Sequence, residues 1–178
     1  ALAVQNVTNG ADMFNTAVGY SAGSGVTTGI RNTLIGAAAG DAITDADENE
    51  AFGYSALTAN VLGSGSVAIG SFALSSQNPA SAVTMYNTAV GNGAGAAVTT
   101  GVQNTFVGGL AGDANTTASN NTAVGSDALT ANTTGASNVG IGKNALEANT
   151  TGAESVAVGK SALGSQTTDT GNIAVGFQ

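Results

Sequence analysis

Residues 121–129 read Asn-Thr-Ala-Val-Gly-Ser-Asp-Ala-Leu, and variants of this stretch return along the chain. Its glycine belongs to a series in which every step is 17 residues except for one step of 21. A short and strict period indicates one structural unit stacked on copies of itself. We call the members of this series the corner glycines: Gly19, Gly36, Gly53, Gly70, Gly91, Gly108, Gly125, Gly142, Gly159 and Gly176.

The residue before each corner glycine is always large and apolar. The segment that it closes is short and rich in β-branched residues, which predicts a strand that ends in a turn. A unit of 17 residues is too short for a helical hairpin repeat. We therefore expect an apolar core stripe made of Val18, Ile35, Phe52, Ile69, Val90, Val107, Val124, Ile141, Val158 and Val175.

The residue four places before each corner glycine is asparagine in all units but two, where Ser66 and Ser155 replace it. Stacked strands place equivalent residues about 4.8 Å apart, so these side chains should form an amide ladder. Its expected members are Asn15, Asn32, Asn49, Asn87, Asn104, Asn121, Asn138 and Asn172. The glycines themselves should supply a positive φ or a close approach of the chain.

These patterns predict an all-β fold, a parallel β-solenoid of about ten rungs of 17 residues each, forming one domain over residues 1–178. Residues 15–86 recur as 87–158, and residues 159–178 follow, so a block of four rungs is duplicated. The four extra residues of the long step lie near 76–86 and predict one bulged loop. Ala1-Leu2 and Phe177-Gln178 fit consecutive slots of the repeat, so we expect a segment of a longer fibre.

Composition narrows the functional classes. The chain has 178 residues, no Cys, His or Trp, and only 8% charged residues, against about 25% in ordinary domains. Three basic residues and a net charge of −8 argue against a nucleic-acid partner, because a phosphate backbone needs cationic contacts. No apolar stretch approaches the length of a membrane span, so we expect no membrane insertion by this segment.

Catalytic and cofactor motifs are weak. Residues 19–23 match the G-x-S-x-G pattern, but a serine triad needs a histidine, so we predict no enzyme and no cofactor. Asp45, Asp47 and Asn49 faintly resemble a calcium loop, although Glu50 stands where that loop needs glycine. A solvated acidic loop is the favoured interpretation.

Threonine pairs also recur at the period of the repeat, at Thr99-Thr100, Thr116-Thr117, Thr133-Thr134, Thr150-Thr151 and Thr167-Thr168. They predict a second corner of the coil and leave ice binding open as an alternative. Adjacent strand residues face opposite ways, which argues against that alternative. Asn132 and Asn149 begin glycosylation sequons, but we interpret both as parts of the second corner.

Residues 66–70, Ser-Val-Ala-Ile-Gly, and 155–159, Ser-Val-Ala-Val-Gly, resemble the head repeats of trimeric autotransporter adhesins, the YadA-like heads. The variant at 121–129 also resembles repeats of phage tail-fibre proteins and bacterial surface-fibre proteins. The resemblance implies a left-handed β-roll and a tight homotrimer. It covers nearly the whole chain, although the family's units are usually somewhat shorter.

Together these patterns predict a non-catalytic extracellular fibre segment for adhesion or receptor contact on a cell or virion surface. Its expected partners are its own copies and a host-surface or matrix ligand. The thin core favours an oligomer, because each rung buries only two or three modest apolar side chains. Contact with a target should use the variable loops at 45–50 and 77–86. A purely architectural filament that polymerises end to end is the alternative.

Overall fold

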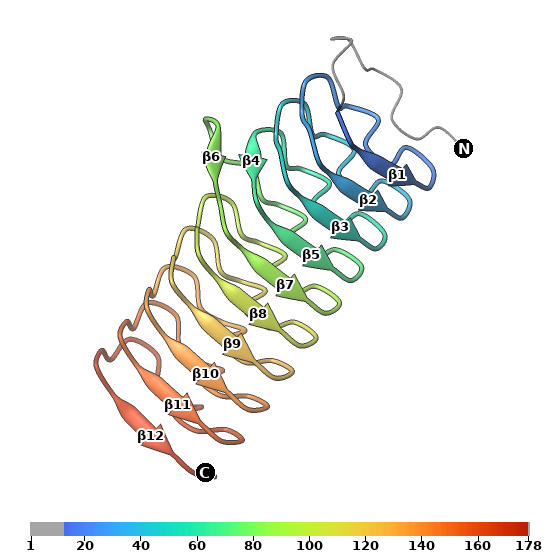
Figure 1. The fold of residues 1–178 in the computed structure, drawn as a ribbon. Coiled ribbons are helices and arrows are strands. Elements are labelled where there is room, and N and C mark those ends of the chain that lie inside the picture. Colours follow the sequence, from blue (N-terminus) through green and yellow to red (C-terminus); the bar gives the residue numbers. More distant parts are fainter. Residues whose placement is uncertain (1–12, 178) are drawn as a thin grey trace.

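The computed structural model describes residues 13–177, so the expectations for Ala1, Leu2 and Gln178 lie outside the described residues. The described chain winds as a coil in which a ten-stranded parallel sheet runs along one side (Figure 1). The strands of this sheet are β1 (Thr16–Val18), β2 (Thr33–Ile35), β3 (Glu50–Phe52), β5 (Val67–Ile69), β7 (Thr88–Val90), β8 (Thr105–Val107), β9 (Thr122–Val124), β10 (Val139–Ile141), β11 (Val156–Val158) and β12 (Ile173–Val175). The expected parallel β-solenoid is confirmed.

Each strand pairs in register with the equivalent strand of the next rung. Val124 lies opposite Ile141, and Ile141 lies opposite Val158. The long step keeps the same register, since Ile69 on β5 pairs with Val90 on β7. The extra residues therefore leave the sheet unbroken and are absorbed elsewhere in the coil.

The insertion forms the bulged loop that the sequence predicts. It contains β6 (Val83–Thr84), which pairs in parallel with β4 (Gly63–Ser64) in a separate two-stranded sheet. Figure 1 shows β6 standing out beside β4 at one edge of the coil. Pro79 and Met85 are buried at its base, whereas residues 80–84 are exposed.

The corner glycines are required both by conformation and by space. Their φ values lie between 128° and 145°, a region that L side chains rarely adopt. At the nine corners from Gly19 to Gly159, a Cβ atom would lie within 2.6 Å of the carbonyl oxygen of the next corner glycine. Stacked corners approach so closely that a methyl group has no room.

The asparagine ladder joins successive rungs inside the coil. The Asn104 backbone N–H donates to Asn87 Oδ1 at 2.9 Å, and Asn104 Oδ1 accepts from the Asn121 backbone N–H at 3.0 Å. Ser66 and Ser155 continue the ladder by donating their backbone N–H to Asn49 and Asn138. A polar side chain that is buried this way has its hydrogen bonds satisfied by the neighbouring rung.

A second internal amide ladder, which we did not predict, runs beside the first. Asn132 Nδ2 donates to Asn115 Oδ1, and Asn149 Nδ2 donates to Asn132 Oδ1, each at 2.9 Å. Its slot holds valine or isoleucine in other rungs, at Val26, Ile43 and Val98. Because the residue at this position changes from rung to rung, the second ladder is not evident from the sequence.

The core is narrow, and its side chains compensate for one another in size. The strand centre is alanine in most rungs, and in several of them a leucine such as Leu129 fills the facing slot, four residues after the corner glycine. Where the centre is Phe106, the facing slot holds Gly112, whose added Cβ would clash with the ring. The residue three places after each corner glycine from Gly19 to Gly159 is alanine, and these alanines, such as Ala111, are buried. Each rung therefore has room for one large side chain at this level.

Candidate interaction face

The first and last residues of each strand in the ten-stranded sheet point away from the core. They form two parallel columns, which together we call the outer face. The first column contains Thr16, Thr33, Glu50, Val67, Thr88, Thr105, Thr122, Val139, Val156 and Ile173. The second column contains Val18, Ile35, Phe52, Ile69, Val90, Val107, Val124, Ile141, Val158 and Val175.

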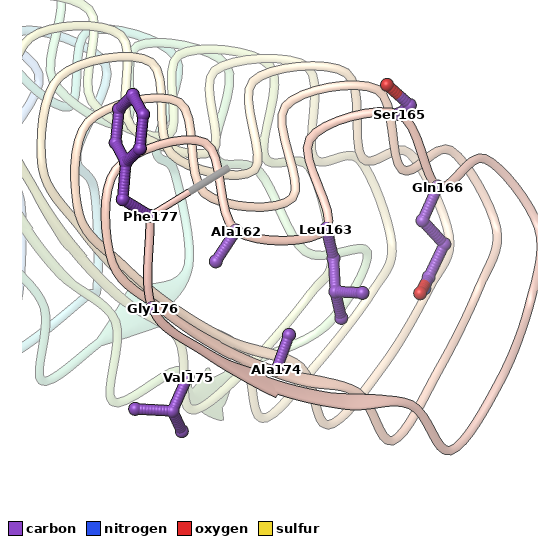
Figure 2. A pocket seen from close by; sticks show the side chains of 8 residues that line it. All are labelled: Ala162, Leu163, Ser165, Gln166, Ala174, Val175, Gly176 and Phe177. Atoms are coloured by element: carbon purple, nitrogen blue, oxygen red, sulfur yellow. The ribbon is translucent and has the colours of Figure 1, made fainter.

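The second column is the stripe that we expected in the core, and that placement is wrong for the single chain. Val18 is 58% exposed, Phe52 56% and Val175 77%, whereas the strand centres are buried, among them Leu34, Phe106 and Ala123. Side chains alternate along a strand, so a strand of three residues has only one inward position. Figure 2 shows this alternation, with Ala174 pointing into the coil and Val175 pointing away.

The outer face is almost without charge. Nineteen of its twenty residues are Thr, Val, Ile or Phe, and the exception is Glu50 at the start of β3. Partial burial raises the pKa of the Glu50 carboxyl, and the nearby Glu48 carboxylate raises it further. Over the length of the described coil, this face is therefore a ladder of uncharged side chains with one ionisable group.

Aromatic side chains extend the apolar surface around the glycine corner of the third and fourth rungs. The Tyr54 and Phe72 rings meet edge to face, with centroids 5.2 Å apart and an interplanar angle of 87°. Both rings are about half exposed, as is Phe52 on the outer face of the same region. Large exposed apolar patches of this kind are typical of interaction surfaces.

The acidic segment is tied to the rung before it. Asp45 Oδ1 accepts hydrogen bonds from the Oγ1 atoms of Thr27 at 2.9 Å and Thr28 at 2.6 Å. These bonds, first to Thr28 and then to Thr27, lower the pKa of Asp45. Asp47 Oδ1 accepts from the Ile30 backbone N–H at 2.8 Å. The carboxylates therefore join stacked rungs.

The calcium candidate is contradicted by the position of Asn49. Its side chain is buried in the ladder, where Nδ2 donates to Gly63 O at 3.0 Å and Oδ1 accepts from the Ser66 backbone N–H at 3.0 Å. Asp45, in contrast, is exposed on the surface. Within residues 13–177 no group of three or more acidic side chains is arranged to hold a metal ion. The spacing resembled a calcium loop, but the three side chains do not face one point, since Asp45 is exposed, Asp47 is half-buried and Asn49 is buried.

The two variable loops lie on the same edge of the coil, with β4 and its flanking residues between them. The Asp47 backbone N–H donates to Ser64 Oγ at 2.9 Å, and the Gly65 backbone N–H donates to Asp47 O at 3.0 Å. Ser64 belongs to β4, which pairs with β6 of the insertion. We call the surface of residues 45–48, 62–65 and 78–86 the composite edge. The position of both loops on one edge follows from the 17-residue period, because equivalent residues of successive rungs stack.

The threonine pairs form the second corner, and their two members differ. Thr116 Oγ1 donates to Thr133 O at 3.0 Å, so the first member bonds to the next rung, while the second member, such as Thr134, is exposed. Only a single column of second members is therefore presented to solvent, and ice binding by it stays a prediction for thermal-hysteresis measurements. Asn132 and Asn149, the sequon asparagines, are fully buried in the second ladder.

One cavity, of about 380 Å³, lies at the last described rung and is open at the end of the coil (Figure 2). Leu163 and Ala174 point into it, and Gln166 lies at its rim. These are core slots that the following rung covers elsewhere in the coil. Residues 19–23, which match the nucleophile-elbow pattern, form the corner of the first rung.

Comparison with known proteins finds no matching family model, no significantly similar curated protein and no similar solved structure. Among the described residues, no helix has the length and apolar character needed to cross a membrane.

Proposed function

We propose that this chain is a non-catalytic extracellular segment of a surface fibre, built from several copies that pack against one another through their outer faces. The resemblance to adhesin head repeats implies three copies, and we take the homotrimer as the form to test. The outer face is the observation that carries this proposal. It presents two columns of side chains, β-branched except at Glu50 and Phe52, that the single chain leaves exposed or half-buried.

The composition of the outer face supports an interface between copies. Interfaces in homo-oligomers are more apolar than ordinary surface, and their centres are depleted of charge. The chain as a whole carries a net charge of −8, yet the outer face contains one ionisable side chain. The outer face has few charges with which to attract a charged partner, so it favours a partner whose contact surface is apolar.

The spacing of the outer face indicates a second copy as that partner. Its side chains repeat at the separation of stacked strands, about 4.8 Å, along all ten strands of the sheet. A copy of the same chain has the same repeat, so its side chains can interdigitate along the full length. A partner with any other period would fit over only a few rungs.

The composite edge is our candidate for contact with a host-surface or matrix ligand. It departs from the regular repeat, and loops that project from a solenoid carry function more often than its regular faces. It also lies on a different surface from the outer face, so packing between copies would leave it accessible. Within it, Glu48 forms an ion pair with Arg31, with an Nη2–Oε1 distance of 2.7 Å.

Sedimentation velocity tests the assembly. We expect wild-type protein to sediment as an oligomer of three chains of 16.9 kDa each. The Ile141→Glu variant should sediment as a monomer, and its circular dichroism spectrum should be unchanged. Glu50 already stands on this sheet face, so a single chain accommodates glutamate there. Thr134→Glu, on the second corner, is the matched control and should remain oligomeric. A wild-type monomer at tens of micromolar would refute the proposal.

End-to-end growth into an architectural filament is the second candidate. It is favoured by the identical in-register pairing of successive rungs, which a rung from another copy could continue. Electron microscopy separates the two candidates, because lateral packing gives particles of fixed length, whereas end-to-end growth gives filaments of varying length. Ile141→Glu would leave filaments intact.

A further inference from the structure

We infer that Glu50 restrains self-association through the outer face, so that copies bind one another more tightly when this side chain is neutral. The inference rests on the proposed packing of copies, and it makes the strength of that packing depend on the charge of Glu50. Protonation of Glu50, or its replacement by glutamine, should shift the chain toward the assembled state.

The position of Glu50 makes it part of any interface that covers the outer face. It lies in the first column between Thr33 and Val67, with which it is paired in the sheet, and two residues from Phe52. If copies pack in parallel, the Glu50 side chains of different copies meet at the same level. If they pack antiparallel, Glu50 meets the apolar residues of a distant rung. Either arrangement removes water from the carboxylate.

Within residues 13–177, no cationic side chain acts on Glu50. Its neighbours on β2 and β5 are the uncharged Thr33 and Val67, and the charged group that acts on it is Glu48, whose effect is repulsive. The ion pair found within the described residues joins Arg31 to Glu48, with an Nη2–Oε1 distance of 2.7 Å. A carboxylate that is covered without a cationic partner carries a large desolvation penalty.

The direction of the pH effect follows from proton linkage. The pKa of Glu50 is already raised in the single chain, and further burial between copies would raise it more. The assembled state then binds protons more readily than the free chain. Association should strengthen as the pH falls through the pKa of the assembled state, and should level off below the pKa of the free chain.

Fluorescence-detected sedimentation from nanomolar to micromolar concentration tests this control. At pH 7.5 we expect Glu50→Gln to lower the dissociation constant at least about tenfold, because the variant removes the desolvation penalty of a covered carboxylate that has no cationic partner. Between pH 7.5 and 5.0, at constant ionic strength, wild-type association should strengthen, and that of Glu50→Gln should change much less. Glu147→Gln removes an exposed carboxylate away from the outer face and should behave as wild type.

The outcomes separate this inference from the proposed function. If wild type and Glu50→Gln associate with equal strength and equal pH dependence, Glu50 has no controlling role, while the packing of copies stands. If neither protein associates at any pH, packing through the outer face is itself refuted. If Glu147→Gln tightens association as much as Glu50→Gln, the effect is one of net charge and the inference fails.

Discussion

At the scale of single residues, the corner glycines carry the strictest requirement in the chain. Glycine is needed there for two independent reasons, a φ near 135° and a carbonyl oxygen from the next rung where a Cβ would stand. The neighbouring slots are more tolerant. Leu129 and Leu146, for example, adopt φ values near 54° with ordinary side chains, because their left-handed conformation is accessible to L residues at modest cost.

Two adjacent glycines test this requirement. Gly108→Ala should lower the free energy of unfolding by roughly 3 kcal/mol or more, because the strained φ of 138° and the overlap with Gly125 O act together. Gly109→Ala is the control, since no atom lies within 4 Å of the position of its Cβ. Urea denaturation measures both. Equal stabilities for the two variants would contradict the steric account.

At the scale of elements, a rung is stabilised when the side chain at the strand centre and the side chain that faces it across the narrow interior match in size. Strand centre and facing slot share a fixed volume, so alanine pairs with leucine in the β9 rung and Phe106 pairs with glycine in the β8 rung. Interiors are close-packed, so neither an added nor a missing side chain is accommodated freely. In keeping with this sharing, the facing slot is glycine in the rungs whose strand centre is Leu34 or Phe106, although Gly23 and Gly95 also accompany a small strand centre.

Exchanging the pattern of the β8 rung for that of the β9 rung tests this matching. Phe106→Ala should cost about 3–5 kcal/mol through the cavity that it leaves, and Gly112→Leu should also destabilise, because its side chain would clash with the ring. The double variant should be more stable than the sum of the two predicts. Thermal denaturation of all three proteins completes the cycle, and strict additivity would contradict the matching.

At the scale of the whole molecule, the coil is a one-dimensional stack in which each rung contacts its neighbours. Every strand of the main sheet pairs only with the equivalent strands before and after it, so stability is approximately a sum over rungs and their interfaces. The coil tolerates extra residues in a projecting loop, because β5 and β7 keep their register across the insertion. What must be preserved is the phase of the repeat.

Deleting one rung tests the importance of phase. Removal of residues 126–142 takes out 17 residues and joins Gly125 to Lys143 in the same slot order, so we expect cooperative unfolding and a β-rich circular dichroism spectrum. Removal of residues 126–141 takes out one residue fewer and leaves Gly142 as a surplus residue directly after Gly125, at a corner where successive rungs stack too closely to absorb it as the projecting loop absorbs its extra residues. We expect that protein to be markedly less stable. Similar melting temperatures for both deletions would contradict the requirement.

Several features were predictable from the sequence because stacking copies a pattern from one rung to the next. The 17-residue period alone indicates which residues are neighbours, which explains the success with the Asn87–Asn104–Asn121 ladder, the glycine corners and the bulged insertion. The calcium candidate failed because it was judged by spacing along the chain, whereas Asn49 faces inward and Asp45 faces solvent.

The sequence by itself determined that equivalent side chains stack in columns, since a strict period leaves no other arrangement for the rungs. Only the tertiary structure decided which columns are inside. Hydrophobicity favoured Val124 over Ala123 for the core, yet Ala123 is buried and Val124 belongs to the outer face. The physical reason is the width of the coil: with Leu129 filling the interior from the facing side, the strand centre has room for little more than a methyl group.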